Sequence, residues 1–402
     1  MLLIFLACSA IEPEITAGDP TAPMDECNPG CFSVRMAEDG NVAANKKIVV
    51  RVEPAGPKPL ELELETDESG ETEICLPPGT LPVGVATLTI SMGIQKAEYP
   101  LDIRPFGYHV GRERTAGAPE STSTPQVKLP ETPFLSNEKD TWYAYQISTP
   151  SYAHGLLAFA GSPRWEGGSG HNPYHIGVAR LNADWSIASI SDAPVITPSD
   201  WDANTQHDPS LIWDGTQYIL YYQGKPDGNA DPSIGRAFSP DGETWTSDPN
   251  NPVYVNAAEH GASHAMVLRQ DETLSEMWHA GLGGMGYALS VDEGATWEGY
   301  CANPVFPAQE DGSVKTPEVS WDGEHYRMAF AVGADEIWRI GWAESYDGIR
   351  WTRGEDMLEP GTHGWDNEDL SNASLVDGPN GPTWMLGAVG TESSAVVLAE
   401  AR

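Results

Sequence analysis

Basic residues are scarce in this chain, and acidic residues greatly exceed them. Its 402 residues include 22 Lys and Arg against 59 Asp and Glu, which gives a formal net charge of −37. Such a surface repels phosphate backbones and anionic lipid, so the composition argues against nucleic acid as a partner. The acidic residues are spread over turns rather than gathered in a tail. We interpret them as the surface of a highly soluble extracellular protein.

Long apolar runs are also missing. After the first ten residues, "MLLIFLACSA", no stretch approaches the ~20 apolar residues that a membrane-spanning helix needs. Those ten residues resemble a bacterial lipobox, with Phe5, Leu6 and Ala7 preceding Cys8. The resemblance implies a signal over residues 1–8 and a lipid on Cys8 as the only membrane contact. We expect an exported outer-membrane or cell-surface lipoprotein, and a secreted or periplasmic protein is the alternative.

Cysteines are few, since the chain has only five. Three of them, Cys27, Cys31 and Cys75, lie close together in the N-terminal third, where an exported chain can oxidise them. We expect one disulfide there. The sequence does not choose between the Cys27–Cys75 and Cys31–Cys75 pairings.

Long helical patterns are absent, and short apolar stretches bounded by Gly, Pro, Asp and Asn predict an all-β protein. Residues 9–26 are Pro-rich and acidic, which is typical of a flexible tether. Residues 27–105 contain stretches such as "KKIVVRV" and "LELELET", and their later part resembles bacterial Ig-like domains. We predict a small Ig-like β-sandwich over residues 27–105 and a linker over residues 106–125.

An internal repeat begins near residue 126 and carries the motif Ile-Gly-x-Ala. Its first position recurs at intervals of 58, 51, 55 and 56 residues, at Ile176, Ile234, Met285, Ile340 and Val396. A regular period of this length, with about four strands in each repeat, is a propeller signature. We therefore predict a five-bladed β-propeller over residues 126–402. Residues 126–135 resemble the outer strand that the fifth repeat lacks, and are predicted to close blade five.

A turn motif accompanies the repeat. The stretch "SVDEGATW" (290–297) resembles the Asp-box of sialidases, and near copies occupy residues 239–245 and 345–351. Its Asp and Gly suit a tight turn between the third and fourth strands of a blade. We interpret the motif as structural and distant from the tunnel mouth. A sialidase would also need an arginine cluster, for which basic residues are too few.

Residues 199–254, from "SDWDANTQHDPSLIWDG" to "NPVY", resemble the five-bladed glycoside hydrolase superfamily, which includes arabinanases, β-xylosidases, levansucrases and invertases. The resemblance covers residues 126–402. It implies three carboxylates around a central tunnel, acting as base or nucleophile, orienting group and acid. The first strand of each blade should line this tunnel. Aligning the first strands makes Asp208, His264, Thr316 and Asn372 equivalent.

Three carboxylates are the candidate catalytic residues on this basis. Asp208 lies at the start of a first strand, and Asp140 precedes the first strand of blade one. Glu318 lies two residues beyond Thr316 and on the same strand face. Its segment resembles the part of the superfamily that bears the acid, but Lys315 stands where that acid would be.

Sugar binding is expected at aromatic and polar residues near the tunnel mouth, because sugar faces stack on aromatic rings. The candidates are Trp165, Trp201, Trp338, Trp365, His207, His264 and Asn372. We expect no required cofactor. The superfamily resemblance implies a structural calcium ion near His264 and Asp208, with hydrogen-bonded histidines as the alternative. No spacing along the sequence specifies zinc.

Two functions remain open at this stage. One is a monomeric hydrolase, furanosidase- or xylosidase-like, that cleaves a poly- or oligosaccharide with acid–base carboxylate chemistry. The other is a catalytically inactive propeller that binds carbohydrate. Lys315 and the non-acidic residues His264, Thr316 and Asn372 favour the second function.

Overall fold

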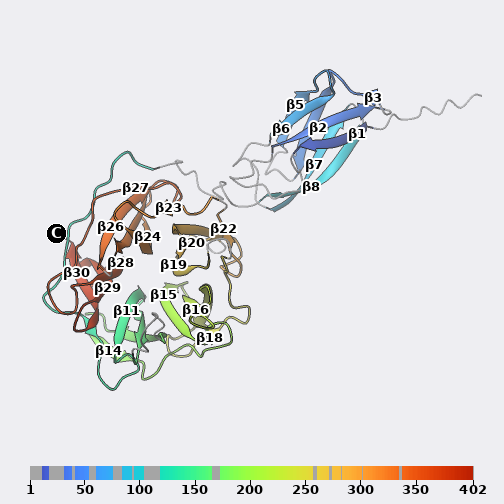
Figure 1. Cartoon of the computed structure of the whole chain (residues 1–402). Coiled ribbons are helices and arrows are strands. Elements are labelled where there is room, and N and C mark those ends of the chain that lie inside the picture. The colour runs from blue at the N-terminus through green and yellow to red at the C-terminus, as the bar shows by residue number, and fades with distance from the viewer. Residues whose placement is uncertain are drawn as a thin grey trace, which may run out of the picture. The chain divides into compact units, whose positions relative to one another are not determined.

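The computed structural model shows an all-β protein whose described residues contain strands and turns but no helix (Figure 1). The chain divides into two compact units, Met1–Arg114 and Thr115–Arg402. No segment in the described part of the chain forms a helix long and apolar enough to cross a membrane. The described residues are 11–17, 31–38, 41–53, 60–75, 84–92, 95–103, 118–164, 173–256, 260–270, 274–281, 283–300, 302–334 and 337–401.

Two antiparallel sheets form the N-terminal unit. In one, β2 pairs with β1, β3 and β6, and in the other the order is β5-β4-β7-β8. Alternate residues of β4 are buried, among them Ile48 and Val50, and they pack against Val34 of β2 and Leu88 of β7. The two sheets therefore share one apolar core. The strands are β1 (Ile11–Ala17), β2 (Cys31–Glu38), β3 (Asn41–Val42), β4 (Lys47–Glu53), β5 (Leu60–Glu65), β6 (Glu71–Cys75), β7 (Gly84–Met92) and β8 (Gln95–Ile103).

The first strand lies where the sequence predicts a flexible tether over residues 9–26. Instead, β1 pairs antiparallel with β2, from Ile11 opposite Glu38 to Ala17 opposite Ser33. An unpaired strand edge presents N–H and C=O groups that favour the addition of another strand. Composition cannot reveal such an edge, so this part of the predicted tether differs from the structure.

Backbone register also bears on the cysteines. Cys31 of β2 lies directly opposite Cys75 of β6. Opposed residues of an antiparallel pair have Cα atoms about 4.5–5.5 Å apart, within the range that a disulfide spans. Cys8 and Cys27 lie outside the described residues.

The second unit is a β-propeller made of antiparallel meanders arranged in a ring (Figure 1). Five meanders, which we number as blades 1 to 5, account for its described strands. Blade 1 has β11 (Gln146–Ala153), β12 (Leu156–Ser162), β13 (His175–Leu181) and β14 (Ile187–Ile190); blade 2 has β15 (Thr205–Trp213), β16 (Tyr218–Lys225), β17 (Ser233–Ser239) and β18 (Thr246–Ser247); blade 3 has β19 (Ser263–Arg269), β20 (Ser275–Gly281), β21 (Gly284–Ser290), β22 (Glu298–Gly299) and β23 (Phe306–Pro307); blade 4 has β24 (Ser313–Trp321), β25 (Tyr326–Ala334), β26 (Ile337–Ser345) and β27 (Thr352–Arg353); blade 5 has β28 (Asp369–Gly378), β29 (Gly381–Val389), β30 (Ser394–Ala401), β9 (Val127–Lys128) and β10 (Leu135–Ser136).

Blade 5 combines both ends of the propeller unit. Strand β30 pairs with β29 on one side and with β9 and β10 on the other, for example through Leu135 opposite Val396. The first strands of the blades touch in a closed cycle, β11–β15–β19–β24–β28–β11. The first strands therefore surround the central axis, and side chains on their inner face line the tunnel.

The apolar cores lie between neighbouring blades. Second strands are buried on both faces, as in β12, where every residue is buried. The blade-1 residues Leu156 and Val178 pack with the blade-2 residues Leu211 and Leu220, and comparable clusters join blades 2 and 3, blades 4 and 5, and blades 5 and 1. This packing holds each first strand in a fixed position around the tunnel.

Candidate active site

Every first strand carries a β-bulge at the same height. In each of them the pairing register shifts around one residue that adopts a left-handed backbone conformation. A positive φ is uncommon for non-glycine residues and clusters at functional sites. The five residues are Thr149 (φ 48°), Asp208 (φ 51°), His264 (φ 48°), Thr316 (φ 51°) and Asn372 (φ 49°).

A second ring of residues lies two positions further along these strands. Its members line a cavity of about 150 Å³ on the tunnel axis, and Glu318 contributes its only acidic side chain among the lining residues. Each first strand supplies one member, namely Ser151, Ser210, Met266, Glu318 and Ser374. Glu318 therefore faces this cavity, although the bulge between Lys315 and Glu318 interrupts the alternation that would have placed it on the same strand face as Thr316.

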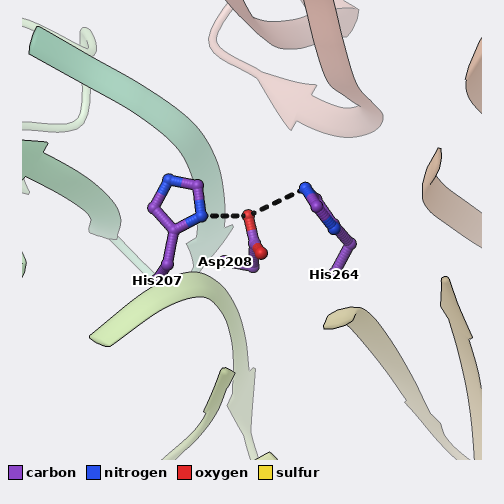
Figure 2. A group of neighbouring side chains, drawn as sticks. All are labelled: His207, Asp208 and His264. Carbon is purple, nitrogen blue, oxygen red and sulfur yellow. Dashed lines mark ion pairs between the residues drawn. The ribbon is translucent and has the colours of Figure 1, made fainter. Parts of the chain in front are cut away.

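The Asp208 carboxylate lies between two imidazole rings, those of His207 and His264 (Figure 2). Its Oδ1 atom is 2.8 Å from Nδ1 of His207 and 3.5 Å from Nε2 of His264, and only 1% of its side chain is exposed. No donor among the described residues has full hydrogen-bond alignment with either carboxylate oxygen, although His207 Nδ1 is close enough to stabilise the charged form. A buried carboxylate without aligned donors is costly and points to a ligand or a reaction.

The surroundings of Asp208 keep its carboxylate ionised. Burial by itself would raise the pKa of Asp208, but the electrostatic effects of His207, His264 and Lys315 lower it below the ordinary aspartate value. Burial lowers the pKa of His264 to about 4, although the neighbouring Asp208 acts in the opposite direction. His264 is therefore neutral at neutral pH.

Glu318 has the opposite electrostatic character. Burial raises the pKa of Glu318 to about 8, the charge of Asp208 raises it further, and a hydrogen bond from Asn372 partly offsets both effects. The Asn372 amide Nδ2 donates to Glu318 Oε1 over 3.3 Å. At neutral pH the tunnel therefore holds one ionised carboxylate and one protonated carboxylic acid.

Lys315 belongs to a polar group at the junction of blades 4 and 5. Its Nζ atom is 3.1 Å from Asp369 Oδ2 and 3.9 Å from the centre of the Trp338 ring. The backbones of Trp338 and Asp369 pair in parallel, which joins the two blades at this point. Lys315 therefore lies over the half-buried Trp338 indole at the junction of the two blades.

Several residues proposed from the sequence lie elsewhere or serve packing. Asp140 is exposed in the turn before β11, and Thr149 occupies the equivalent position in blade 1 instead. The Trp201 ring covers Gly224 and Gly235, where an added Cβ would lie 2.2 Å and 2.4 Å from the ring. This contact explains the glycine of the Ile-Gly-x-Ala motif in blade 2 and makes Trp201 a packing residue.

Trp365 and Trp165 are the other two tryptophans whose predicted place at the tunnel the structure does not confirm. Trp365 stacks on His363 with ring centres 5.2 Å apart and packs against the core of blades 4 and 5, so it also has a packing role. Trp165 lies outside the described residues.

The sequence analysis missed Tyr174 and Ser148, which position His207. The Tyr174 ring centre is 4.2 Å from that of His207, and Ser148 Oγ is 3.2 Å from His207 Nε2. Ser148 occupies the position directly before the blade-1 bulge, as His207 does in blade 2. A correct alignment of blade 1 would have revealed Ser148, whereas no sequence signal marks Tyr174.

The ligand preference of the calcium ion expected near His264 can be compared with the donor atoms that the site offers. One ligand atom each from His207, Asp208 and His264 lies within 4.8 Å of the others. Two of these three donors are imidazole nitrogens, whereas calcium prefers six to eight oxygen ligands. The residues therefore fit calcium poorly.

Comparison with known proteins supports the architecture. No protein-family profile matches the chain. Levanase from Bacillus subtilis is 26% identical over 206 residues, which is 46% of this chain and 30% of levanase. The chain thus spans about a third of the length of this curated relative.

Solved structures share the fold at low sequence identity. One belongs to a study of the GH130 family of mannoside phosphorylases, whose glycoside hydrolases target β-1,2 mannosidic linkages in Candida mannan. It has a TM-score of 0.57 and 13% identity, and the match covers 71% of this chain and 96% of that one. A glycosidase-like protein from Bacteroides thetaiotaomicron has a TM-score of 0.54 and 14% identity, with 68% and 96% covered. A glycosyl hydrolase from Bacteroides ovatus has a TM-score of 0.54 and 14% identity, with 71% and 96% covered.

Proposed function

We propose that this chain, which has the fold of the β-propeller glycoside hydrolase superfamily, hydrolyses a poly- or oligosaccharide at its tunnel. Asp208 acts as the ionised carboxylate and Glu318 as the general acid. One observation carries the proposal: Asp208 is buried between two histidines and Glu318 lines the tunnel cavity beside the Asn372 amide, so that the pKa of Asp208 is lowered and that of Glu318 is raised. Such a pair meets the needs of glycoside cleavage, which requires a protonated acid and an ionised base or nucleophile.

Other groups near the tunnel have supporting roles. Asn372 orients Glu318 through its amide, and His207 and His264 flank Asp208. Trp338, held by Lys315, supplies an aromatic surface for a sugar ring. The comparison with levanase supports a glycoside substrate without specifying the sugar.

The experiment is a turnover assay on a panel of aryl glycosides and polysaccharides. We expect Asp208→Asn and Glu318→Gln each to lower kcat/KM by roughly 10²–10⁴-fold, the range for loss of general acid–base catalysis. The matched control is Asp140→Asn, which removes an exposed carboxylate outside the tunnel and should leave turnover unchanged. Wild-type turnover that survives both tunnel substitutions would contradict the assignment.

The second candidate function is carbohydrate binding without catalysis. Lys315 in the acid position and the 1% exposure of Asp208 favour it. Glycan-array binding by the wild-type protein, with no turnover on any substrate of the panel, would select this function. Trp338→Ala should then weaken binding, because it removes the stacking surface.

We also propose that the protein is exported and attached to a bacterial membrane by a lipid on Cys8. The support is the lipobox-like sequence alone, since Cys8 lies outside the described residues. Expression with a labelled fatty acid should give a labelled protein in the membrane fraction. Cys8→Ser should abolish labelling, and label retained by this variant would overturn the proposal.

A further inference from the structure

The tunnel also contains a set of side chains arranged like metal ligands. We propose that His207, Asp208 and His264 bind a divalent transition metal ion of the zinc class. The donor atoms are His207 Nδ1, Asp208 Oδ1 and His264 Nε2, which come from two neighbouring blades and lie together in Figure 2. This inference rests on the geometry of the three donors rather than on the proposed hydrolase activity, and a metal bound here would engage the Asp208 carboxylate that the proposed reaction uses.

The distances suit a common metal centre. Asp208 Oδ1 lies 2.8 Å and 3.5 Å from the two nitrogens, and all three ligand atoms fall within 4.8 Å of one another. Zinc bonds to nitrogen and carboxylate oxygen are about 2.0–2.2 Å long, so neighbouring ligands of a tetrahedral site lie roughly 3.3 Å apart. Small side-chain rotations would bring the three donors to that spacing.

The carboxylate of Asp208 provides independent support. Its side chain is 1% exposed, and neither oxygen has an aligned hydrogen-bond donor among the described residues. Removing a carboxylate from water without such donors carries a large desolvation cost. A bound cation would offset that cost directly, whereas an imidazole held out of line does so weakly.

Two serines set the orientation of the histidine rings. Ser148 Oγ lies 3.2 Å from His207 Nε2, and Ser263 Oγ lies 3.1 Å from His264 Nδ1. When each serine oxygen accepts the proton of the outer nitrogen, the inner nitrogen that faces Asp208 keeps its lone pair. Outer hydrogen bonds of this kind fix the tautomer of metal-binding histidines.

The donor types select the class of metal. Two imidazoles and one carboxylate suit zinc and its first-row neighbours, and calcium or magnesium would require mainly oxygen donors. With three protein ligands, zinc retains an open coordination position for water or another small ligand. The inferred site therefore differs from the calcium site that the superfamily resemblance implies.

The test uses the full chain, stripped of metal with a chelator and titrated with cobalt(II). We expect one equivalent to bind with the visible absorption of a four- or five-coordinate cobalt centre, and zinc to displace it. His264→Ala should weaken binding by at least 100-fold. Ser263→Ala, which removes only the outer hydrogen bond, should weaken it by roughly 10-fold.

The matched control is His154→Ala, which removes an exposed histidine that stacks on Trp213 rather than facing the tunnel. Its cobalt spectrum should match that of the wild type, and near-ultraviolet circular dichroism should show that each variant is folded. Absence of the cobalt band, unchanged binding in His264→Ala, or displacement of cobalt by calcium would each overturn the proposal. All of these readouts are independent of glycoside turnover.

Discussion

At the residue scale, the central feature is the contrast between Asp208 and Glu318. Both side chains face the same tunnel from neighbouring levels, but their surroundings differ. Asp208 has two histidines and Lys315 nearby, whereas Glu318 has only the amide of Asn372 to offset burial. The environment, rather than the residue type, therefore assigns one group as ionised and the other as protonated.

The raised pKa of Glu318 predicts a pH-dependent stability. Between its ordinary pKa of 4.5 and about 8, the folded chain retains a proton that the unfolded chain releases. The free energy of unfolding should therefore fall as pH rises through this window, by up to about 1.4 kcal/mol per pH unit from this group. Denaturant unfolding at pH 5 and pH 8 measures the difference.

Glu318→Gln is the comparison for this prediction, because glutamine has a similar shape and does not titrate. Its pH dependence between 5 and 8 should be flatter than that of the wild type. Identical slopes for the two proteins would show that Glu318 has an ordinary pKa. The same variant should also lose the fall in kcat/KM that we expect as pH rises through about 8.

At the element scale, the Asp-box turns join neighbouring blades. In the turn of blade 3, Ser290 Oγ accepts from Gly294 N over 2.9 Å, and Asp292 Oδ1 accepts from Thr296 N over 2.9 Å. Arg236 of blade 2 donates from Nη1 to the carbonyl of Glu293 over 2.8 Å. The motif that resembles sialidases therefore has a structural role here, as its sequence suggested.

Gly294 should not tolerate a side chain. It has φ +76°, and an added Cβ would lie 1.9 Å from the hydroxyl of Tyr221, which is buried in blade 2. We expect Gly294→Ala to destabilise the propeller by about 2–4 kcal/mol, from overpacking and backbone strain together. Differential scanning calorimetry should show a Tm several degrees lower.

Gly215→Ala is the matched control for steric overlap. Gly215 also has a positive φ, +103°, but no atom lies within 4 Å of its added Cβ. This variant should lose only about 1 kcal/mol. Equal losses in the two variants would mean that backbone strain alone accounts for the effect of Gly294→Ala.

The register of β2 and β6 predicts the disulfide of the N-terminal unit. Cys31 lies opposite Cys75, so we expect these two residues to be linked under oxidising conditions. Peptide mapping without reduction should recover a Cys31–Cys75 peptide, both in the wild type and in Cys27→Ser. A Cys27–Cys75 peptide in the wild type would contradict this pairing.

At the scale of the whole molecule, ring closure connects distant parts of the chain. Strands β9 and β10 complete blade 5 by pairing with β30, which lies more than 250 residues after them in the sequence. Without them, β30 would have an open edge. The stability of the propeller should therefore depend on this short N-terminal segment.

A pair of truncations tests that dependence. Deleting residues 126–136 should lower the Tm of the propeller and promote aggregation, because it exposes the edge of β30 and removes Val127 from its core cluster. Deleting residues 1–114 should leave the propeller transition nearly unchanged, since those residues form a separate compact unit. Equal loss of stability in the two truncations would contradict closure by β9 and β10.

Local patterns in the sequence determined the all-β class and the propeller, because each repeat carries its own strand and turn signals. They also aligned Asp208, His264, Thr316 and Asn372, which share the left-handed conformation at the bulge. These features depend on residues close together in the chain, where backbone geometry and periodicity act directly. Blade 1 was harder, since Thr149 rather than the exposed Asp140 occupies the equivalent position.

Only the tertiary structure decided which side chains meet. His264 reaches Asp208 because their blades are neighbours in the ring, and Asn372 reaches Glu318 for the same reason. Likewise, β1 becomes a strand because β2 offers it an edge, and Trp201 packs because two glycines make room for its ring. Contacts, burial and pKa shifts all depend on distances between segments that are separate in the sequence, so they arise only when the chain has folded.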